Sequence, residues 1–129
     1  MNYLIDTHAF LWYITNDPSL SQTAKQIIGN HANTIFVSIA SMWEISIKVS
    51  QNKLTIIPQP FIPFIENQLK INDFLLLPIK LNDVGVVSTL PFYHKDPFDR
   101  IMIAQAMVNQ MPLISVDALF DSYPITKIW

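Results

Sequence analysis

The feature of this sequence that most constrains its fold is a series of short apolar runs that alternate with segments of helical character. The runs occupy residues 2–5, 34–37, 74–79 and 112–116, and few of their side chains are polar. Strands that do not alternate polar with apolar residues are typical of parallel sheets buried on both faces. Because these strands are separated by helices, we predict an α/β protein with three layers, α/β/α, around a central parallel sheet.

The segments between the strands contain helix starts and stops. The turn signals Asn16-Asp17-Pro18 and Gly29-Asn30 end two early helices, and the prolines between residues 58 and 63 predict a loop. Helices are expected over residues 7–14, 19–28, about 40–50, 64–70, 82–89 and from 96 onward. A helical turn at 118–121 and a closing strand at 125–128 complete the predicted order.

The composition indicates one domain over residues 1–129. The chain is long enough to bury a core, and 50% of its residues are hydrophobic while only 14% are charged. This apolar surplus favours an oligomer or a tight protein partner. The formal net charge of -2 argues against binding polyanions through bulk charge, so nucleic acid would require a local basic patch or bound cations.

The chain also carries signals about its compartment. It contains no cysteine, which excludes disulfides and thiolate chemistry. Asp6 interrupts the first apolar run and no basic leader precedes it, so we expect no signal peptide. No apolar stretch is long enough to span a bilayer, so we expect a cytoplasmic protein without membrane contact.

Three acidic residues are expected at one edge of the sheet. Asp6 follows the first strand, Asp117 follows the strand at 112–116, and Asp99 lies in the first turn of the helix that begins at Asp96. Ligands of parallel sheets bind outside the carboxyl ends of the strands, where all three acids would lie. Each acid taken alone is equally well explained as a helix cap, and Asp96 is the most easily explained in this way.

Glu44 is a fourth candidate. It stands three residues after Ser41, the spacing of a capping box, and four before Lys48, the spacing of an ion pair. Its apolar neighbours Trp43 and Ile45 indicate a helix with little exposed surface, where an acid requires a partner or a cation. Other aspartates are interpreted as turn or surface residues: Asp17, Asp73, Asp83 and Asp121.

Converging carboxylates indicate a hard divalent cation. They would repel one another without a cation between them, and Mg²⁺ or Mn²⁺ prefers carboxylate oxygens. His8 and His94 lack the spacing of a zinc site, and with His31 they are expected to be ordinary surface or hydrogen-bonded residues.

Other classes of site lack their usual residues. With two glycines the chain has no phosphate-cradling loop and no dinucleotide fingerprint. No second acid stands two residues after Asp6, which weakens an aspartyl-phosphate phosphatase reading, and the elbow glycines of a serine hydrolase are missing around the serines. Phosphate chemistry at an all-carboxylate magnesium site remains by elimination.

Four motifs in order resemble those of the PIN domain family. They are Leu-Ile-Asp-Thr-His at residues 4–8, Ser-Ile-Ala-Ser-Met-Trp-Glu at 38–44, Asp-Pro-Phe-Asp-Arg at 96–100 and Ser-Val-Asp at 115–117. The likeness covers nearly the whole chain and is to the branch that contains the VapC-type toxins of bacterial toxin–antitoxin pairs. It implies a PIN-like sheet in the order 3-2-1-4-5 and metal-dependent ribonuclease activity.

The resemblance also implies which residues make the active site. The catalytic and metal-binding quartet would be Asp6, Glu44, Asp99 and Asp117. One or two Mg²⁺ or Mn²⁺ ions held there would orient and deprotonate a water and stabilise the leaving oxygen of an RNA phosphodiester.

Further residues would assist the quartet. Asp96 is an extra acid of this branch and a possible metal ligand, and Thr7 or Ser38 would be a polar auxiliary. Ser115 stands where threonine is frequent in the family, a departure that bears on metal or water positioning. Three basic residues are candidates either to steer the RNA backbone or to pair with neighbouring acids: Lys48, Lys95 and Arg100.

Two alternatives from other classes stay open. One is a catalytically silent PIN-like module that binds RNA or protein. The other is a receiver-like signalling domain, which requires a second acid beside Asp6 and a lysine after a late strand, whereas Lys127 lies within the terminal strand.

Two protein partners are expected. Aromatic residues that a chain of this size hides with difficulty favour a homodimer, and they are Phe61, Phe64, Phe74, Phe92, Tyr93 and Trp129. The resemblance implies a cognate antitoxin near the acids. Such a partner would inhibit most simply by placing an arginine or lysine among the four carboxylates.

Overall fold

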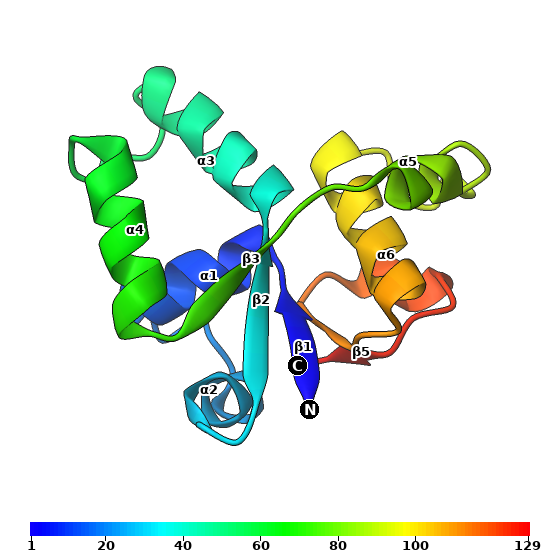
Figure 1. Cartoon of the computed structure of the whole chain (residues 1–129), viewed down its shortest axis with the longest axis horizontal. Helices are drawn as coiled ribbons and strands as arrows, with labels where there is room; N and C mark the ends of the chain where they lie inside the picture. The colour runs from blue at the N-terminus through cyan, green and yellow to red at the C-terminus, as the bar shows by residue number, and fades with distance from the viewer.

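The computed structural model describes all residues from 1 to 129 and has a central sheet with helices on both sides (Figure 1). Along the chain the elements are β1 (Asn2–Ile5), α1 (Thr7–Ile14), α2 (Gln22–Gly29), β2 (Thr34–Ser38), α3 (Ile39–Ser50), α4 (Phe61–Ile71), β3 (Phe74–Leu77), α5 (Leu81–Val87), α6 (Pro97–Asn109), β4 (Leu113–Ile114), the 3-10 helix η1 (Ala118–Ser122) and β5 (Lys127–Ile128).

The five strands form one parallel sheet in the order β3-β2-β1-β4-β5. The first strand is central: Leu4 pairs with Phe36 of β2 on one side and with Leu113 of β4 on the other. This order and the three layers confirm the predicted fold class.

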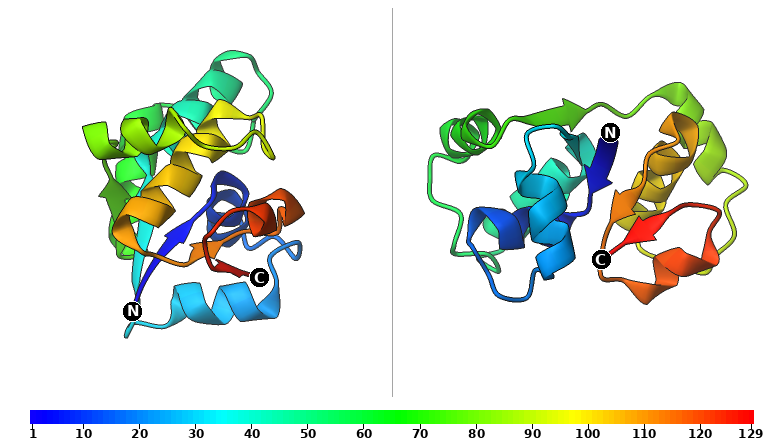
Figure 2. Two further views of the ribbon diagram at one scale, coloured as in Figure 1. Left: turned by 90° about the vertical axis from the view of Figure 1, so that its right-hand side faces the viewer. Right: turned by 90° about the horizontal axis from the view of Figure 1, so that it is seen from below.

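Side chains of the central strand alternate between two hydrophobic cores. Tyr3 and Ile5 pack into the larger core, together with residues of α1 to α4, whereas Leu4 packs into the smaller core with residues of α6 and η1. The views in Figure 2 show the helices distributed on the two sides of the sheet. Because both faces of the central strand are covered, its buried residues Tyr3, Leu4 and Ile5 are all hydrophobic, as the sequence indicated.

Four elements that start at the carboxyl edge of the sheet are capped by side chains. Asp6 accepts a hydrogen bond from the backbone of Ala9 (2.8 Å), and Ser38 accepts one from Ala40 (3.0 Å). Asp96 caps α6 and Asp117 caps η1 in the same way. Each cap satisfies amide hydrogens that have no partner within the helix, and together the caps gather polar side chains at one edge.

Helix α4 is longer than the sequence predicted. It begins at Phe61 rather than at residue 64, with Pro60 at its N-cap and Pro63 in its first turn. A proline is tolerated there because the first amide groups of a helix have no intrahelical acceptor. The expected loop therefore stops at Pro60.

The aromatic residues divide between core and surface. Phe74 is buried, and Phe61, Phe64 and Trp129 are partly buried against the larger core. Phe92 and Tyr93 are exposed, as is Trp43, which the sequence analysis placed in a helix with little exposed surface. No helix of the structure is both long and apolar enough to cross a membrane.

Candidate active site

The first acid is held where β1 meets α1. Asp6 is buried, and its carboxylate also receives a hydrogen bond from the Ser115 hydroxyl. The neighbouring Thr7 donates its hydroxyl hydrogen to Oε1 of Glu44 (2.7 Å), which links the start of α1 to α3. Thr7 and Glu44 are 37 positions apart in the chain. Because Thr7 directly follows Asp6, their contact places Glu44 at the same edge as Asp6.

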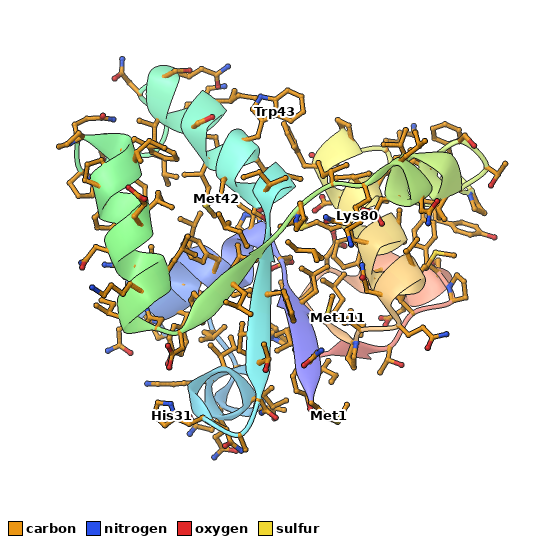
Figure 3. All side chains as sticks on the ribbon, viewed as in Figure 1. Met1, His31, Met42, Trp43, Lys80 and Met111 are labelled. Carbon is orange, nitrogen blue, oxygen red and sulfur yellow. The ribbon has the colours of Figure 1, made fainter.

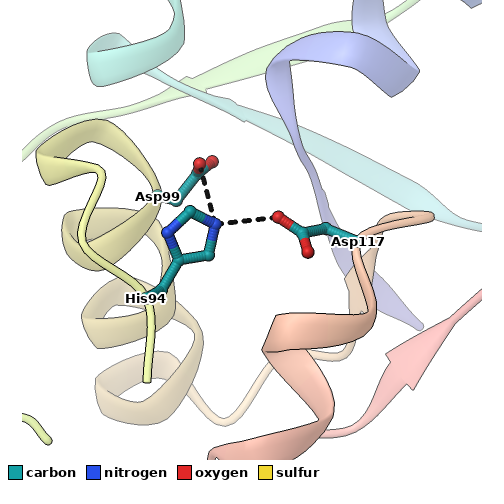
Figure 4. Close-up of side chains that lie close together, drawn as sticks. All are labelled: His94, Asp99 and Asp117. Carbon is teal, nitrogen blue, oxygen red and sulfur yellow. Dashed lines mark hydrogen bonds and ion pairs between the residues drawn. The ribbon is translucent and has the colours of Figure 1, made fainter. Parts of the chain in front are cut away.

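Asp99 and Asp117 meet around His94 (Figure 4). The ring nitrogen Nε2 of His94 lies 2.8 Å from Oδ2 of Asp117 and 3.2 Å from Oδ2 of Asp99. These three ligand-type atoms lie within 4.8 Å of one another. The start of α6 and the start of η1 are thereby joined by side chains.

Charge effects link Asp99 to other acids at this edge. Burial is the main cause that raises the pKa of Asp99 to about 7; the charges of Asp96, Glu44 and Asp6 also raise it, and that of His94 lowers it. Ionised carboxylates that lie close together repel one another, and this repulsion costs free energy unless a cation lies between them. A carboxyl group that resists ionisation among other carboxylates is typical of a site that receives a positive charge.

The pKa of Asp6 is raised by burial, an effect that hydrogen bonds from Ser115 and Ala9 and the charge of His8 oppose, while the charge of Asp117 adds to it. Asp6 and Asp117 therefore interact, just as Asp99 interacts with Glu44 and Asp6. Of the four acids, side-chain contacts join Asp99 and Asp117 through His94, and charge effects link Asp6 and Glu44 to them.

The predicted auxiliary residues lie at this edge with defined partners. Asp96 uses Oδ1 to cap α6, accepting from the backbone of Phe98 (2.8 Å) and Asp99 (3.1 Å). The Ser38 hydroxyl is likewise used as a cap by Ala40. Thr7, by contrast, contacts an acid of the quartet directly.

The basic candidates differ in where they lie. Lys48 forms an ion pair with Glu44 (3.5 Å), and Lys95 is exposed. Arg100 is buried, and its guanidinium donates to the carbonyl oxygens of Leu90, Pro91 and His94. Arg100 therefore points inward and its hydrogen-bond donors hold the chain that leads into α6.

Histidine placement partly differs from the sequence analysis. His8 is exposed and His31 lies near α2, at the opposite end of the molecule from α3 (Figure 3). His94 is buried and belongs to the acidic cluster, which the sequence analysis missed. The sequence signal was its position two residues before the α6 cap, but its partner Asp117 is 23 residues away and only the fold shows the contact.

The residues at this edge suit a hard divalent cation. Carboxylate oxygens from four different elements converge, with neutral hydroxyl groups of Thr7 and Ser115 beside them. Mg²⁺ and Mn²⁺ prefer such oxygen ligands. The pKa of Asp99 is raised mainly by burial and further by the charges of Asp96, Glu44 and Asp6, two effects that a bound cation would offset.

The fold, a parallel sheet between two layers of helices with acids at its carboxyl edge, defines a broad class of α/β proteins. Comparison with known families identifies the family within that class. The sequence model of the PIN domain matches residues 3–125. The chain therefore belongs to the PIN domain family.

Solved structures with the same fold come from toxin–antitoxin complexes. The chain is similar to VapBC2 from Rickettsia felis bound to a promoter DNA fragment, with 15% identity, 99% of this chain and 98% of that chain covered and a TM-score of 0.70. A toxin–antitoxin complex from Klebsiella pneumoniae has 17% identity, coverages of 98% and 96% and a TM-score of 0.63. VapBC-5 from Mycobacterium tuberculosis has 14% identity, 98% coverage of both chains and a TM-score of 0.62. No curated protein matches the sequence.

Proposed function

We propose that residues 1–129 form a single PIN domain that hydrolyses RNA phosphodiester bonds with the help of Mg²⁺ or Mn²⁺. The observation that supports this most strongly is the convergence of Asp6, Glu44, Asp99 and Asp117 with a pKa of about 7 at Asp99. A structural cluster of caps has no need to place mutually repelling acids together, whereas a metal-dependent nuclease does.

Each residue has a role in this proposal. The four acids would hold the metal, which when bound supplies water activation and stabilises the charge that develops on the phosphate. Thr7 fixes the orientation of Glu44, and Ser115 fixes that of Asp6. Asp96 caps α6 and raises the pKa of Asp99, so it contributes charge to the site in addition to its structural role.

Basic residues beside the acids would attract the RNA backbone. Lys48 lies next to Glu44 in space, and Lys95 is exposed in the segment that leads into α6. With a net charge of -2 the protein offers no general attraction for polyanions, so these lysines and the bound metal would provide it locally.

We also propose that the protein is the toxin of a toxin–antitoxin pair and forms a homodimer. The structures it is similar to include toxin–antitoxin complexes, which supports an antitoxin as partner. An apolar hollow of about 260 Å³ is lined by residues of α3 and α6, among them Trp43 and Phe98, the chain neighbours of Glu44 and Asp99. Trp43 extends from α3 toward the start of α6 (Figure 3), where its ring lies 5.1 Å from that of Phe98. A partner with an apolar side chain in this hollow could also reach the carboxylates with an arginine or lysine.

Cleavage of a mixed RNA substrate by the purified protein tests the nuclease proposal. We expect cleavage with Mg²⁺ or Mn²⁺, none with a chelator, and none with Asp99→Asn. The matched control is Asp83→Asn, which changes a buried aspartate outside the cluster. Metal-independent cleavage, or full activity of Asp99→Asn, would contradict the proposal.

One observation favours the second candidate, a catalytically silent PIN-like module that binds RNA or protein. His94 lies between Asp99 and Asp117 and so partly satisfies the two acids without a metal. A silent module would bind neither Mg²⁺ nor Mn²⁺ and would cleave no RNA. Calorimetric titration with Mn²⁺ separates the two candidates before any substrate is known.

A further inference from the structure

His94 is held in a defined position by contacts at both its backbone and its ring. Its backbone amide donates to the hydroxyl of Tyr123 (2.7 Å), and its carbonyl accepts from the guanidinium of Arg100 (3.0 Å). The Tyr123 hydroxyl donates in turn to the carbonyl of Pro91 (2.7 Å). The ring packs against Phe120, with the ring centroids 5.4 Å apart. This many contacts on a loop residue indicate that the direction of the imidazole matters.

Arg100 strengthens the same segment. Besides His94 it donates to the carbonyl oxygens of Leu90 and Pro91, each at 2.9 Å, and its guanidinium lies 3.9 Å from the centre of the Phe92 ring. A buried guanidinium with its donors used on backbone carbonyls holds a loop rigidly, because breaking any bond leaves a charge poorly solvated. The loop from Leu90 to His94 is thus fixed from α6 on one side and from Tyr123 on the other.

The hydrogen bonds of the ring assign its tautomer. The backbone amide of Asp96 donates to Nδ1 of His94 (3.2 Å), so Nδ1 carries a lone pair and no hydrogen. In a neutral imidazole the hydrogen then lies on Nε2, which is the atom that faces Asp117 and Asp99. A nitrogen that carries hydrogen cannot bind a metal, so His94 belongs to the cluster as a hydrogen-bond donor and not as a ligand.

We propose that His94 is a positioning residue for the metal site: its Nε2–H donates to Asp117 and lies against Asp99, and so sets the spacing of the two carboxylates for a shared cation. This inference rests on the proposed metal-dependent function. The hydrogen bond of Nε2 uses Oδ2 of Asp117, and the same nitrogen lies 3.2 Å from Oδ2 of Asp99, which leaves Oδ1 of Asp99 for a cation. Residues that orient metal ligands through hydrogen bonds typically change metal affinity when they are replaced.

Two matched variants test the proposal. His94→Phe keeps an aromatic ring against Phe120 and removes both ring nitrogens, whereas His94→Gln keeps an N–H donor near the position of Nε2. The affinity of the whole protein for Mn²⁺ is measured by calorimetry or electron paramagnetic resonance, beside the metal concentration that gives half-maximal RNA cleavage. We expect His94→Phe to weaken Mn²⁺ binding about 10- to 100-fold, and His94→Gln to bind close to wild type.

The readout separates positioning from a purely structural role. Thermal melts of both variants show whether the fold is retained, and a structural role would lower the melting temperature without changing Mn²⁺ affinity. Unchanged affinity in His94→Phe would overturn the proposal. Tighter binding in that variant would also overturn it, because His94 would then compete with the metal.

A second measurement distinguishes failure of this inference from failure of the proposed function. Nitrogen NMR of the imidazole in the metal-free protein reports which ring nitrogen carries the hydrogen, whether or not the protein binds metal or cleaves RNA. We expect hydrogen on Nε2 and a lone pair on Nδ1. Hydrogen on Nδ1 would overturn the positioning role, whereas an absence of Mn²⁺ binding by the wild-type protein would overturn the proposed nuclease function.

Discussion

The acidic edge and the first turn of α5 both bury an aspartate, and the two regions use it differently. Asp83 was interpreted from the sequence as a turn or surface residue, which is wrong: it is buried and its Oδ2 accepts from the backbone amide of Lys80 (2.8 Å). This contact belongs to a capping box at the start of α5. At the acidic edge, Asp99 instead lies among other acids that raise its pKa.

This comparison teaches that burial of an acid does not by itself indicate a site. Asp83 has a backbone donor at one oxygen, and its other oxygen is buried without a hydrogen-bond partner. One unpartnered oxygen is a modest local cost. Asp99 is partly buried and close to other acids, and both effects raise its pKa, which represents a larger cost. A chain retains such a cost where it has a chemical use.

The largest expected effect is on RNA cleavage, which should depend on the acidic edge and not on Asp83 of α5. Asp99→Asn or Asp117→Asn is expected to reduce RNA cleavage at least about 100-fold, since each removes the charge of a carboxylate that we propose as a metal ligand. Rates at high Mg²⁺ concentration measure this, and Asp83→Asn serves as the matched control with an expected wild-type rate. If Asp99→Asn keeps its activity, Asp99 is only a helix residue.

The second expected effect concerns the capping aspartate. Asp83→Ala removes the acceptor of the Lys80 amide and is expected to lower the free energy of unfolding by about 1–2 kcal/mol, as for other lost caps. Urea denaturation measures the change, and the cleavage rate below the unfolding transition should stay at the wild-type value. A loss of activity without a loss of stability would show that the first turn of α5 also takes part in the site.

The third effect is the pH dependence of stability without metal. The pKa of Asp99 is about 7 in the folded protein against 3.8 for a free carboxyl, so the folded state binds this proton more tightly. Stability contributed by the protonated form is therefore present at low pH and is lost as the pH rises from about 4 to about 7. Its size is on the order of 1 kcal/mol, below the full shift because Asp99 is partly exposed.

Thermal melts across this pH range check the third prediction. Asp99→Asn should remove the decrease in stability, and Mg²⁺ should oppose it in the wild-type protein because a bound cation favours the ionised carboxylate. A wild-type stability that rises steadily through this range and is unchanged in Asp99→Asn would contradict the predicted sign.

The smallest expected effect is at the rim of the acidic edge. Lys48→Ala removes an ion pair with Glu44 that is partly exposed, which is worth no more than about 0.5 kcal/mol of stability. We expect a moderate increase in the RNA concentration that gives half the maximal rate, with kcat unchanged, and a larger difference at low salt. Lys25→Ala is the control, since Lys25 lies in α2 and contacts Asn16 instead of an acid. Equal effects of the two variants would show that Lys48 has no specific role.

The sequence determined the order of the elements and the edge at which the acids gather. Apolar strands, cap residues and turn signals act over a few positions, so β1, α1, α3 and α6 were predicted close to their observed bounds. Since strand ends of a parallel sheet share one edge, Asp6 and Asp117 were expected together from local patterns alone.

The tertiary structure decided which way individual side chains point. His94 meets Asp117, Arg100 turns inward to the carbonyl of Leu90, and Asp83 is buried. His94 and Asp117 are 23 residues apart along the chain, and the Arg100 and Leu90 contact likewise joins α6 to the loop before it. The type of a residue and its neighbours in the sequence limit which contacts its side chain can make. Which of these contacts form depends on packing between segments that are distant in the sequence, so no local pattern predicts them.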